Sequence, residues 1–281
     1  MATSDISAII GNCVQQLGSV IGERNDRDAE RYQQLGRARD FILAQLAATG
    51  GEPRVLPYRW NDVTYENIEL RFTGSNAAAP PLIVGAHYDS ARKAPGANDN
   101  GTGLACLLAL AQLLAHAPLH CPVRLVAFTN EEPPHTRKQS MGSLVYAREL
   151  ARDRVPVQGM ISLETLSPLQ SRLFEPAPLL VVGNLRSYRL TRQVARLMSR
   201  GTQFVSRAIV APGVLPGVRS SDHWSFWQQG WPAVMLTAGG PLTYWHYHRS
   251  SDSVEHTPTA HLSELAIACS EAVLALSKRR E

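Results

Sequence analysis

The sequence lacks the features that would place it in several classes of protein. Its four cysteines, Cys13, Cys106, Cys121 and Cys269, form no CxxC pair, and three of them lie in apolar helix-like runs or at strand edges. This pattern indicates reduced, partly buried thiols. No apolar segment approaches the roughly 20 residues that span a bilayer, and the N-terminus has no basic start followed by an apolar stretch and a cleavage site. We therefore expect a soluble, cytoplasmic protein without a membrane partner.

Charge is not concentrated anywhere in the chain either. The net charge of +4 comes from 28 Lys and Arg against 24 Asp and Glu, and no basic block is longer than Lys278-Arg279-Arg280. Such diffuse charge does not indicate a nucleic-acid partner. What is present is an ordinary globular composition, with 44% hydrophobic residues in 281, and neither a repeat nor a low-complexity tract. We expect residues 1–281 to form a single domain.

Apolar periodicity predicts helices and strands in alternation. Apolar residues recur at helical spacing between Asp5 and Thr49, which predicts two helices, and alternating residues in 54–58 and 65–72 predict a hairpin at a sheet edge. Continuous apolar runs, typical of buried strands, occupy residues 81–87, 123–129, 159–164, 179–182 and 233–238. Helical patterns occupy residues 103–117, 143–152, 188–200, 221–230 and 264–280. This alternation predicts an α/β three-layer sandwich, with a mixed, mostly parallel sheet and helices on both faces.

Acidic and histidine side chains gather where the predicted strands end. In an open α/β sheet, ligands bind outside the carboxyl ends of the strands, so these side chains should lie close together. Convergence of this kind is what a metal site needs. The set comprises His87, Asp89, Asp99, Glu131, Glu132, Glu164, His246 and His248.

Each residue also has a simpler structural explanation. Asp99 could cap the helix that follows it, and the Glu131-Glu132 pair could be a solvated loop. His87 could be a hydrogen-bonded structural histidine, and His248 part of an aromatic surface patch. Glu164 is harder to explain in this way, because a carboxylate that ends a buried strand is costly unless it is paired or binds a cation. A shared location at one sheet edge favours the metal site over five independent explanations.

The motifs around these residues resemble a known family. The stretches GAHYDS, PGANDNGTG, FTNEEP, ISLET, SDHWSFWQQGWPAVML and YHRSSD span residues 85–252 in the order found in the zinc-dependent exopeptidases of metallopeptidase family twenty-eight. That family includes bacterial leucyl-type aminopeptidases and, as a divergent branch, glutaminyl cyclases. The resemblance implies an aminopeptidase that removes the first residue of peptides with a free N-terminus.

The resemblance also implies a ligand set of two Zn²⁺ ions per chain. Asp99 would bridge the two ions, His87 and Glu164 would hold one of them, and Glu132 and His248 would hold the other. Histidine nitrogens and carboxylate oxygens are ligands that zinc accepts in catalytic sites. Two such ions can share a carboxylate bridge and a water whose pKa is lowered toward about 7.

Three further residues take catalytic roles in the same resemblance. Glu131 would be the general base that accepts the proton of the attacking water. Asp89 would accept the second N–H of the His87 imidazole and fix its tautomer. Tyr247 matches a family position proposed to polarise the substrate carbonyl.

Some positions depart from the family pattern. The family more often has Asp where this chain has Glu164, and residues 133–143 form a longer, more basic loop that could be a lid or a specificity wall. His135, Arg137 and Lys138 in that loop are interpreted as solvated. We interpret Asp222 and His223 as a helix cap and pocket lining.

Other assignments stay open or rest on local context. Capping and metal binding are compatible here, since Asn98 or Asn100 can cap the following helix and leave Asp99 free to bridge. Spacing to the SSD motif favours His248 over His246 as the last ligand. A glutaminyl-cyclase-like acyltransferase with one zinc and a non-catalytic binding protein remain as alternative functions. The oligomeric state and the preferred N-terminal residue are left open.

Overall fold

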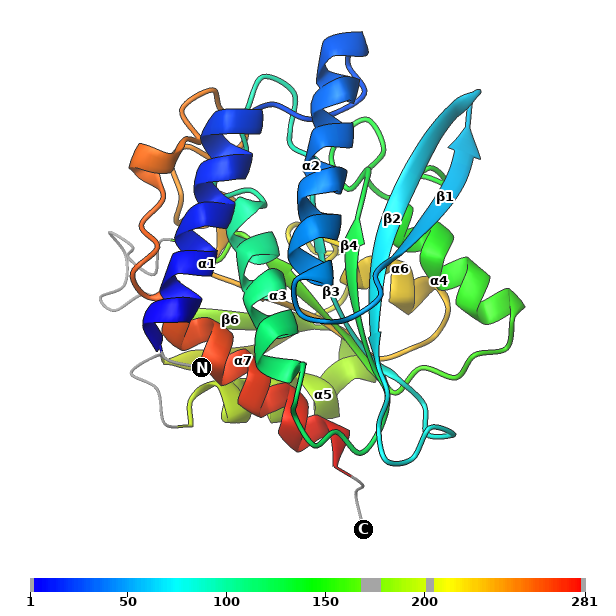
Figure 1. The fold of residues 1–281 in the computed structure, drawn as a ribbon. Coiled ribbons are helices and arrows are strands. Elements are labelled where there is room, and N and C mark those ends of the chain that lie inside the picture. Colours follow the sequence, from blue (N-terminus) through cyan, green and yellow to red (C-terminus); the bar gives the residue numbers. More distant parts are fainter. Residues whose placement is uncertain (1–2, 168–177, 201–204, 279–281) are drawn as a thin grey trace.

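A mixed eight-stranded sheet forms the centre of the computed structural model, which describes residues 3–167, 178–200 and 205–278 (Figure 1). The strand order is β1-β2-β4-β3-β5-β8-β6-β7. Strands β4, β3, β5 and β8 are parallel, as are β6 and β7, whereas β1–β2, β2–β4 and β6–β8 pair antiparallel. The strands are β1 (Arg54–Trp60), β2 (Val63–Phe72), β3 (Leu82–His87), β4 (Val123–Phe128), β5 (Gly159–Glu164), β6 (Leu179–Gly183), β7 (Ser206–Val210) and β8 (Ala233–Thr237).

Helices cover both faces of this sheet. Helices α2, α3, α5 and α7 lie on one face, with α1 packed against α3 and α7, and α4 and α6 lie together on the other (Figure 1). The α-helices are α1 (Thr3–Gln15), α2 (Ala29–Ala47), α3 (Gly101–Leu114), α4 (Gly142–Arg152), α5 (Tyr188–Met198), α6 (His223–Gln228) and α7 (Leu262–Ser277). The three-layer α/β sandwich predicted from the sequence is confirmed. None of the helices in the described residues is both long enough and apolar enough to span a bilayer.

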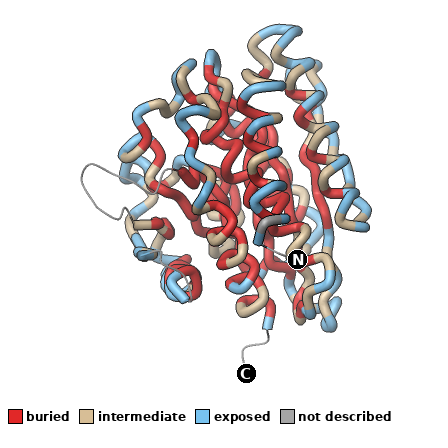
Figure 2. The backbone as a smooth tube through the Cα atoms, turned by 60° about the vertical axis from the view of Figure 1, so that its left-hand side comes forward, coloured by how far each residue is buried: buried red, intermediate tan, exposed pale blue. Residues whose placement is uncertain are grey.

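The alternation of side chains along β3 divides the core in two. Leu82, Val84 and Ala86 point into the larger core under α3 and α7, whereas Ile83 belongs to the smaller core under α4 and α6. All six residues of β3 are buried, because helices cover both faces of this central strand. Figure 2 shows this buried backbone through the interior, with the exposed residues on the outer turns. His87 at the end of β3 is therefore placed by a strand that cannot shift without disturbing both cores.

Two elements differ from the sequence-based prediction. Strand β7 was not predicted, because its five residues are exposed or only partly buried and it lies at the sheet edge with Arg207 facing outward. The first predicted helical region contains, after α1, a π-helix over Gln16–Ile21 that ends at Gly22 with a positive φ of 71°. The last predicted helix ends at Ser277, and its final positions, 279 and 280, lie outside the described residues.

A buried arginine joins the N-terminal helices to the loop between β3 and α3. The Arg24 side chain is fully buried, and its Nε and Nη1 donate to the carbonyls of Tyr88 and Pro95 at 2.6 Å each. Three more carbonyls accept from the same guanidinium, those of Leu17, Gly22 and Gly96. Burial lowers the pKa of Arg24, and the nearby Asp89 and Asp252 carboxylates oppose that shift. Arg24 thus holds residues 88–96, the segment that separates His87 from Asp99.

Replacement of this arginine should destabilise the fold. Arg24→Met keeps much of the side-chain length but leaves five carbonyl oxygens without their donor, so the free energy of unfolding should fall by at least about 3 kcal/mol. Urea unfolding followed by circular dichroism measures this loss. The exposed Arg37→Met is the matched control and should change stability little. A loss in Arg24→Met no larger than in the control would contradict the anchoring role.

Candidate metal centre

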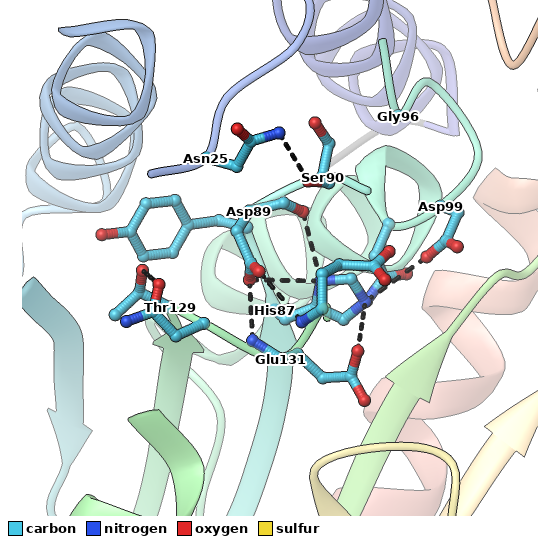
Figure 3. A network of polar contacts seen from close by, with 12 residues as sticks. Asn25, His87, Asp89, Ser90, Gly96, Asp99, Thr129 and Glu131 are labelled. Atoms are coloured by element: carbon cyan, nitrogen blue, oxygen red, sulfur yellow. Dashed lines mark hydrogen bonds and ion pairs between the residues drawn. The ribbon is translucent and has the colours of Figure 1, made fainter. Parts of the chain in front are cut away.

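The residues predicted at the strand ends meet at the carboxyl edge of the sheet. His87 ends β3, Glu131 and Glu132 follow β4, and Glu164 ends β5. Asp99 lies in the turn that leads into α3, and its peptide bond to Asn100 is cis. Figure 3 shows His87 at the centre of this network, with Asp89, Asp99 and Glu131 joined to it by polar contacts. All of these side chains are buried.

The cluster contains two groups of donor atoms that share Asp99, and a third group, His87 with Glu131 and Glu132, that does not include it. The His87 Nε2 lies 3.4 Å from Asp99 Oδ1 and 3.4 Å from Glu164 Oε2. The His248 Nε2 lies 3.1 Å from Asp99 Oδ2 and 3.1 Å from Glu132 Oε2. One carboxylate oxygen of Asp99 therefore faces each of the first two groups, and the donor atoms of each group lie within 4.8 Å of one another.

Several atoms of the cluster are buried without a hydrogen-bond partner among the described residues. They are His87 Nε2, Asp99 Oδ2 and both carboxylate oxygens of Glu132. Burial of a carboxylate oxygen without a hydrogen bond is costly, and a bound cation removes that cost. The donors are imidazole nitrogens and carboxylate oxygens, which suit zinc. The site therefore fits a zinc-type metal by its donor chemistry and by its unpaired atoms.

Asp89 connects the ends of two neighbouring strands. Its two carboxylate oxygens accept the backbone N–H groups of Glu131 and Glu132, each at 3.1 Å. The His87 Nδ1 lies 3.2 Å from the Asp89 carbonyl oxygen and 3.5 Å from its carboxylate. With the proton on Nδ1, the Nε2 lone pair of His87 is directed at Asp99 and Glu164. Asp89 therefore orients the imidazole and at the same time positions the two glutamates that follow β4.

Asp252 performs a similar positioning role for Asp99, and the sequence reasoning missed it. Its carboxylate accepts the backbone N–H groups of Asn98 at 2.9 Å and Asp99 at 3.1 Å, and the Tyr244 hydroxyl at 2.8 Å. Burial, with the nearby Asp99 charge, raises the pKa of Asp252 to about 6. The sequence signal that could have identified Asp252 is its position as the last residue of the YHRSSD motif.

The possible capping of α3 by Asn98 or Asn100 does not occur through either side chain. Asn100 occupies the N-cap position, but its side chain makes no capping bond. It instead donates to the Leu163 carbonyl at 2.8 Å and accepts the Thr165 N–H at 3.0 Å. The Asn98 carboxamide oxygen accepts the Ser167 N–H at 3.2 Å. Both asparagines therefore attach the Asp99 turn to the end of β5, where they satisfy backbone groups that lie outside the sheet ladder.

Gly103 allows this close contact between α3 and β5. A Cβ at this position would lie 2.3 Å from the Asn100 Oδ1 and 2.5 Å from the Leu163 carbonyl oxygen. No side chain fits there without a shift of the backbone. Close packing at Gly103 therefore sets the spacing between the Asp99 turn and the strand that ends in Glu164.

Hydroxyl groups hold the Glu164 carboxylate. Thr165 donates to its Oε1 and Ser221 donates to its Oε2, each at 2.7 Å. The Ser221 hydroxyl also lies 2.8 Å from that of Ser162 on the same strand as Glu164. The longer arm of Glu164 is thus fixed in one orientation toward His87.

Asp222 does not have the capping role expected from the sequence. Asp222 precedes α6, but its side chain makes no capping bond. Neither of its buried carboxylate oxygens has a hydrogen-bond partner among the described residues. Burial raises the pKa of Asp222 to about 7, and the nearby Glu164 adds to the shift. His223 is fully buried and donates from Nε2 to the Val218 carbonyl at 2.8 Å. Burial lowers its pKa to about 4, which keeps it neutral.

The aromatic loop after β8 distinguishes the two candidate histidines. Tyr247 stacks on His248, with ring centroids 4.0 Å apart, and burial followed by the Asp99 and Glu132 charges raises the pKa of its hydroxyl. His246 belongs to neither donor group: its Nδ1 lies 2.9 Å from the Ser251 hydroxyl and its ring stacks on another histidine. His248 is more accessible than the other donors of the two groups, since 33% of its side chain is exposed.

The loop after Glu132 is only partly solvated. His135 is buried, with Nε2 2.8 Å from Asp26 Oδ2 and Nδ1 2.8 Å from the Ser140 hydroxyl, so the expectation of a solvated His135 is wrong. The hydrogen bond with His135 lowers the pKa of Asp26 to about 2. Arg137 and Lys138 are exposed, as expected.

The three-layer sandwich is an α/β architecture found in solved structures of zinc aminopeptidases. BSAP, a zinc aminopeptidase from Bacillus subtilis, superimposes with a TM-score of 0.75 at 16% identity, over 98% of this chain and 95% of that one. The Tannerella forsythia glutaminyl cyclase superimposes with a TM-score of 0.71 at 17% identity, over 100% and 99%. The fold alone therefore admits both chemistries.

Sequence comparison defines the family. The profile of peptidase family M28 matches residues 67–273, and the chain belongs to that family. The uncharacterized protein YfbL of Escherichia coli (strain K12) is 31% identical over 252 residues, which are 82% of this chain and 76% of YfbL. Aminopeptidase YwaD of Bacillus subtilis (strain 168) is 28% identical over 73% of this chain and 43% of YwaD, so the chain spans less than half of that relative. The resemblance inferred from the motifs is confirmed at the level of the family.

The buried carboxylates should make the metal-free protein sensitive to pH. Burial and Asp99 raise the pKa of Glu132 to about 8, and burial raises that of Asp222 to about 7. The folded state thus binds these protons more tightly than the unfolded state, so stability is lost as the pH rises from about 4 to 8. We expect the Tm of chelator-treated protein to fall by several degrees between pH 5 and pH 8, measured by scanning fluorimetry.

Two variants test whether the pH dependence of Tm comes from the buried carboxylates of the site. Glu132→Gln should reduce the slope of Tm against pH, because it removes one of the raised titrations. Glu30→Gln alters an exposed carboxylate and should leave the slope unchanged. A Tm of the metal-free protein that is flat or rising over this range would contradict the prediction.

Proposed function

We propose that residues 1–281 form one catalytic domain, a zinc-dependent aminopeptidase that hydrolyses the N-terminal peptide bond of peptides. The observation that carries this proposal is the position of Asp99, which directs one carboxylate oxygen toward each of two His–carboxylate groups. Membership of peptidase family M28 supports peptide hydrolysis, and the names of aminopeptidase YwaD and of the zinc aminopeptidase BSAP support the metal and the end of the peptide.

Two sets of residues would hold zinc. His87, Asp99 and Glu164 would hold one ion, and Asp99, Glu132 and His248 the other. Bound zinc supplies Lewis-acid chemistry, which polarises a carbonyl and lowers the pKa of a water toward about 7. Asp89 keeps the His87 proton on Nδ1, so that Nε2 remains free to bind.

Glu131 is suited to move the proton of the attacking water. Its carboxylate is buried, and the Oε2 lies 4.0 Å from His87 Nε2, farther than the oxygens of Asp99 and Glu164. Burial, together with the Glu132 and Glu164 charges, raises the pKa of Glu131 well above its usual range. A carboxylate that lies beside the donor atoms but is not itself a ligand can accept the proton of the water and then return it to the departing amine.

Tyr247 and the carboxylates complete the site. The raised pKa of Tyr247 keeps its hydroxyl protonated, so it can donate a hydrogen bond to the carbonyl oxygen of the scissile bond. The free N-terminal amine of a peptide is a cation, and the carboxylate-rich cluster favours it over an internal peptide bond. This preference is the physical basis of exopeptidase rather than endopeptidase action.

Metal content should separate this proposal from its alternatives. We expect about two zinc ions per chain after zinc-replete purification, measured by inductively coupled plasma mass spectrometry. His248→Ala should lower the content to about one ion and abolish hydrolysis. The neighbouring His246→Ala is the matched control and should keep both, because His246 belongs to neither donor group. A single tightly held zinc in the unmodified protein would favour a cyclase-like acyltransferase, and no bound metal would favour a binding protein.

Removal of the base should separate chemistry from metal binding. Glu131→Ala should retain the zinc content but reduce kcat on amino-acid p-nitroanilides by roughly 10²- to 10⁴-fold, the usual contribution of a general base. Glu30→Ala, an exposed glutamate on α2, should keep normal turnover. If Glu131→Ala retained near-normal turnover, the proposed proton transfer would be wrong.

A further inference from the structure

A cationic groove lies beside the loop that leaves the metal centre. It has a volume of about 540 Å³ and is formed by the end of β1, by residues 137–139 at the crest of the loop after Glu132, by the first two turns of α4, and by both ends of the short helix α6. Helices α4 and α6 are joined below it by their Ser143 and Ser225 hydroxyls, 2.8 Å apart. The lining residues are Trp60, Arg137, Lys138, Gln139, Leu144, Arg148, Trp224, Gln228 and Gln229.

The charges of this groove are not balanced. Arg137, Lys138 and Arg148 line it together with no acidic side chain, and across the described ranges none of the three forms an ion pair. By comparison, Arg59 and Arg152 each contact a carboxylate of a near neighbour. Three unpaired cations around one hollow repel one another and attract an anion.

The loop crest that carries two of these cations is held in place. On one side of it the His135 imidazole is bonded to Asp26 and Ser140, and on the other the Tyr58 hydroxyl donates to the Ser140 carbonyl at 2.8 Å. Between these anchors, Arg137 has a positive φ of 58°, and the three crest residues 137–139 are exposed. The crest is therefore a fixed wall that presents its side chains to the groove.

The lining chemistry matches a carboxylate-bearing peptide. Guanidinium and ammonium groups bind carboxylates through charge-assisted hydrogen bonds. The Gln139 and Gln228 amides can donate further bonds, and the Trp60 and Trp224 rings offer flat surfaces for a peptide backbone. A hollow of this size accommodates a few side chains rather than an extended polyanion.

We propose that this groove binds acidic residues of the peptide substrate that lie beyond the residue to be removed. The proposal rests on the aminopeptidase function above. Arg137 is only five residues after Glu132, and α6 directly follows Asp222, so the groove walls are continuous with two segments of the metal centre. The basic 133–143 loop then makes the enzyme prefer peptides that carry negative charge beyond the residue to be removed.

A pair of isosteric peptides tests the groove. The zinc-loaded enzyme should cleave Leu-Gly-Asp-Asp-amide with a kcat/KM roughly tenfold above that for Leu-Gly-Asn-Asn-amide, and added salt should reduce this ratio. The triple variant Arg137→Gln/Lys138→Gln/Arg148→Gln should bring the ratio to about one. Arg152→Gln alters an exposed arginine of the same helix outside the groove, and it should keep the ratio of the unmodified enzyme. Equal cleavage of the two peptides by the unmodified enzyme would overturn the proposal.

Binding measured without turnover separates this proposal from the catalytic one. Isothermal titration calorimetry on zinc-loaded Glu131→Gln should give tighter binding of the acidic peptide than of the neutral one, and the triple substitution should remove the difference. If this difference is found while the unmodified enzyme cleaves no peptide, the proposed binding of acidic residues in the groove is supported and the proposed aminopeptidase function is contradicted. If an oligothymidylate binds as tightly as the acidic peptide and loses binding in the triple variant, the peptide assignment is overturned in favour of a nucleic acid.

Discussion

The concentration of negative charge at one sheet edge is the constraint on which the rest of the structure depends. Seven buried carboxylates meet there, and among the described side chains the buried opposing cations are few, namely Arg24 and any protonated histidines. Buried like charges are unfavourable unless cations bind them or protons neutralise them. A fold that keeps such a cluster must therefore hold it against its own repulsion. The seven are Asp89, Asp99, Glu131, Glu132, Glu164, Asp222 and Asp252.

That restraint comes largely from backbone N–H groups and hydroxyls. The Asp89 carboxylate accepts two N–H groups from the segment after β4, and Asp252 accepts two from the Asp99 turn. Arg24 holds the intervening loop through carbonyls, and among the described residues it has no direct carboxylate partner. The segment after β4 and the Asp99 turn are thus each placed by a carboxylate from another part of the chain, which preorganises the donors that they carry. Such preorganisation lowers the cost of assembling a metal site.

The sequence was sufficient for most of the sheet, for the helix layers and for the gathering of acidic and histidine side chains at the strand ends. Those predictions depend on local signals: continuous apolar runs define buried strands, and parallel strands bring their carboxyl ends to one edge. The missed features depend on partners distant in sequence. Asp252 pairs with a turn about 150 residues earlier, and His135 with Asp26, 109 residues away. Strand β7 escaped notice because an exposed edge strand has no apolar run, and the position of Asn100 favours a capping role that its side chain does not take.

The contact at Gly103 limits how this site can vary between relatives. A single methyl group added at Gly103 would collide with Asn100 and the Leu163 carbonyl. The backbone distance between the Asp99 turn and β5 therefore cannot change in small steps. The extra methylene of Glu164 must then be accommodated within its own side chain, which the Thr165 and Ser221 hydroxyls keep in one conformation. An exchange of Glu for Asp at this position would accordingly need a coordinated change of the hydroxyl partners. Divergence at this edge would proceed by matched replacements of neighbouring side chains, with the main-chain frame conserved.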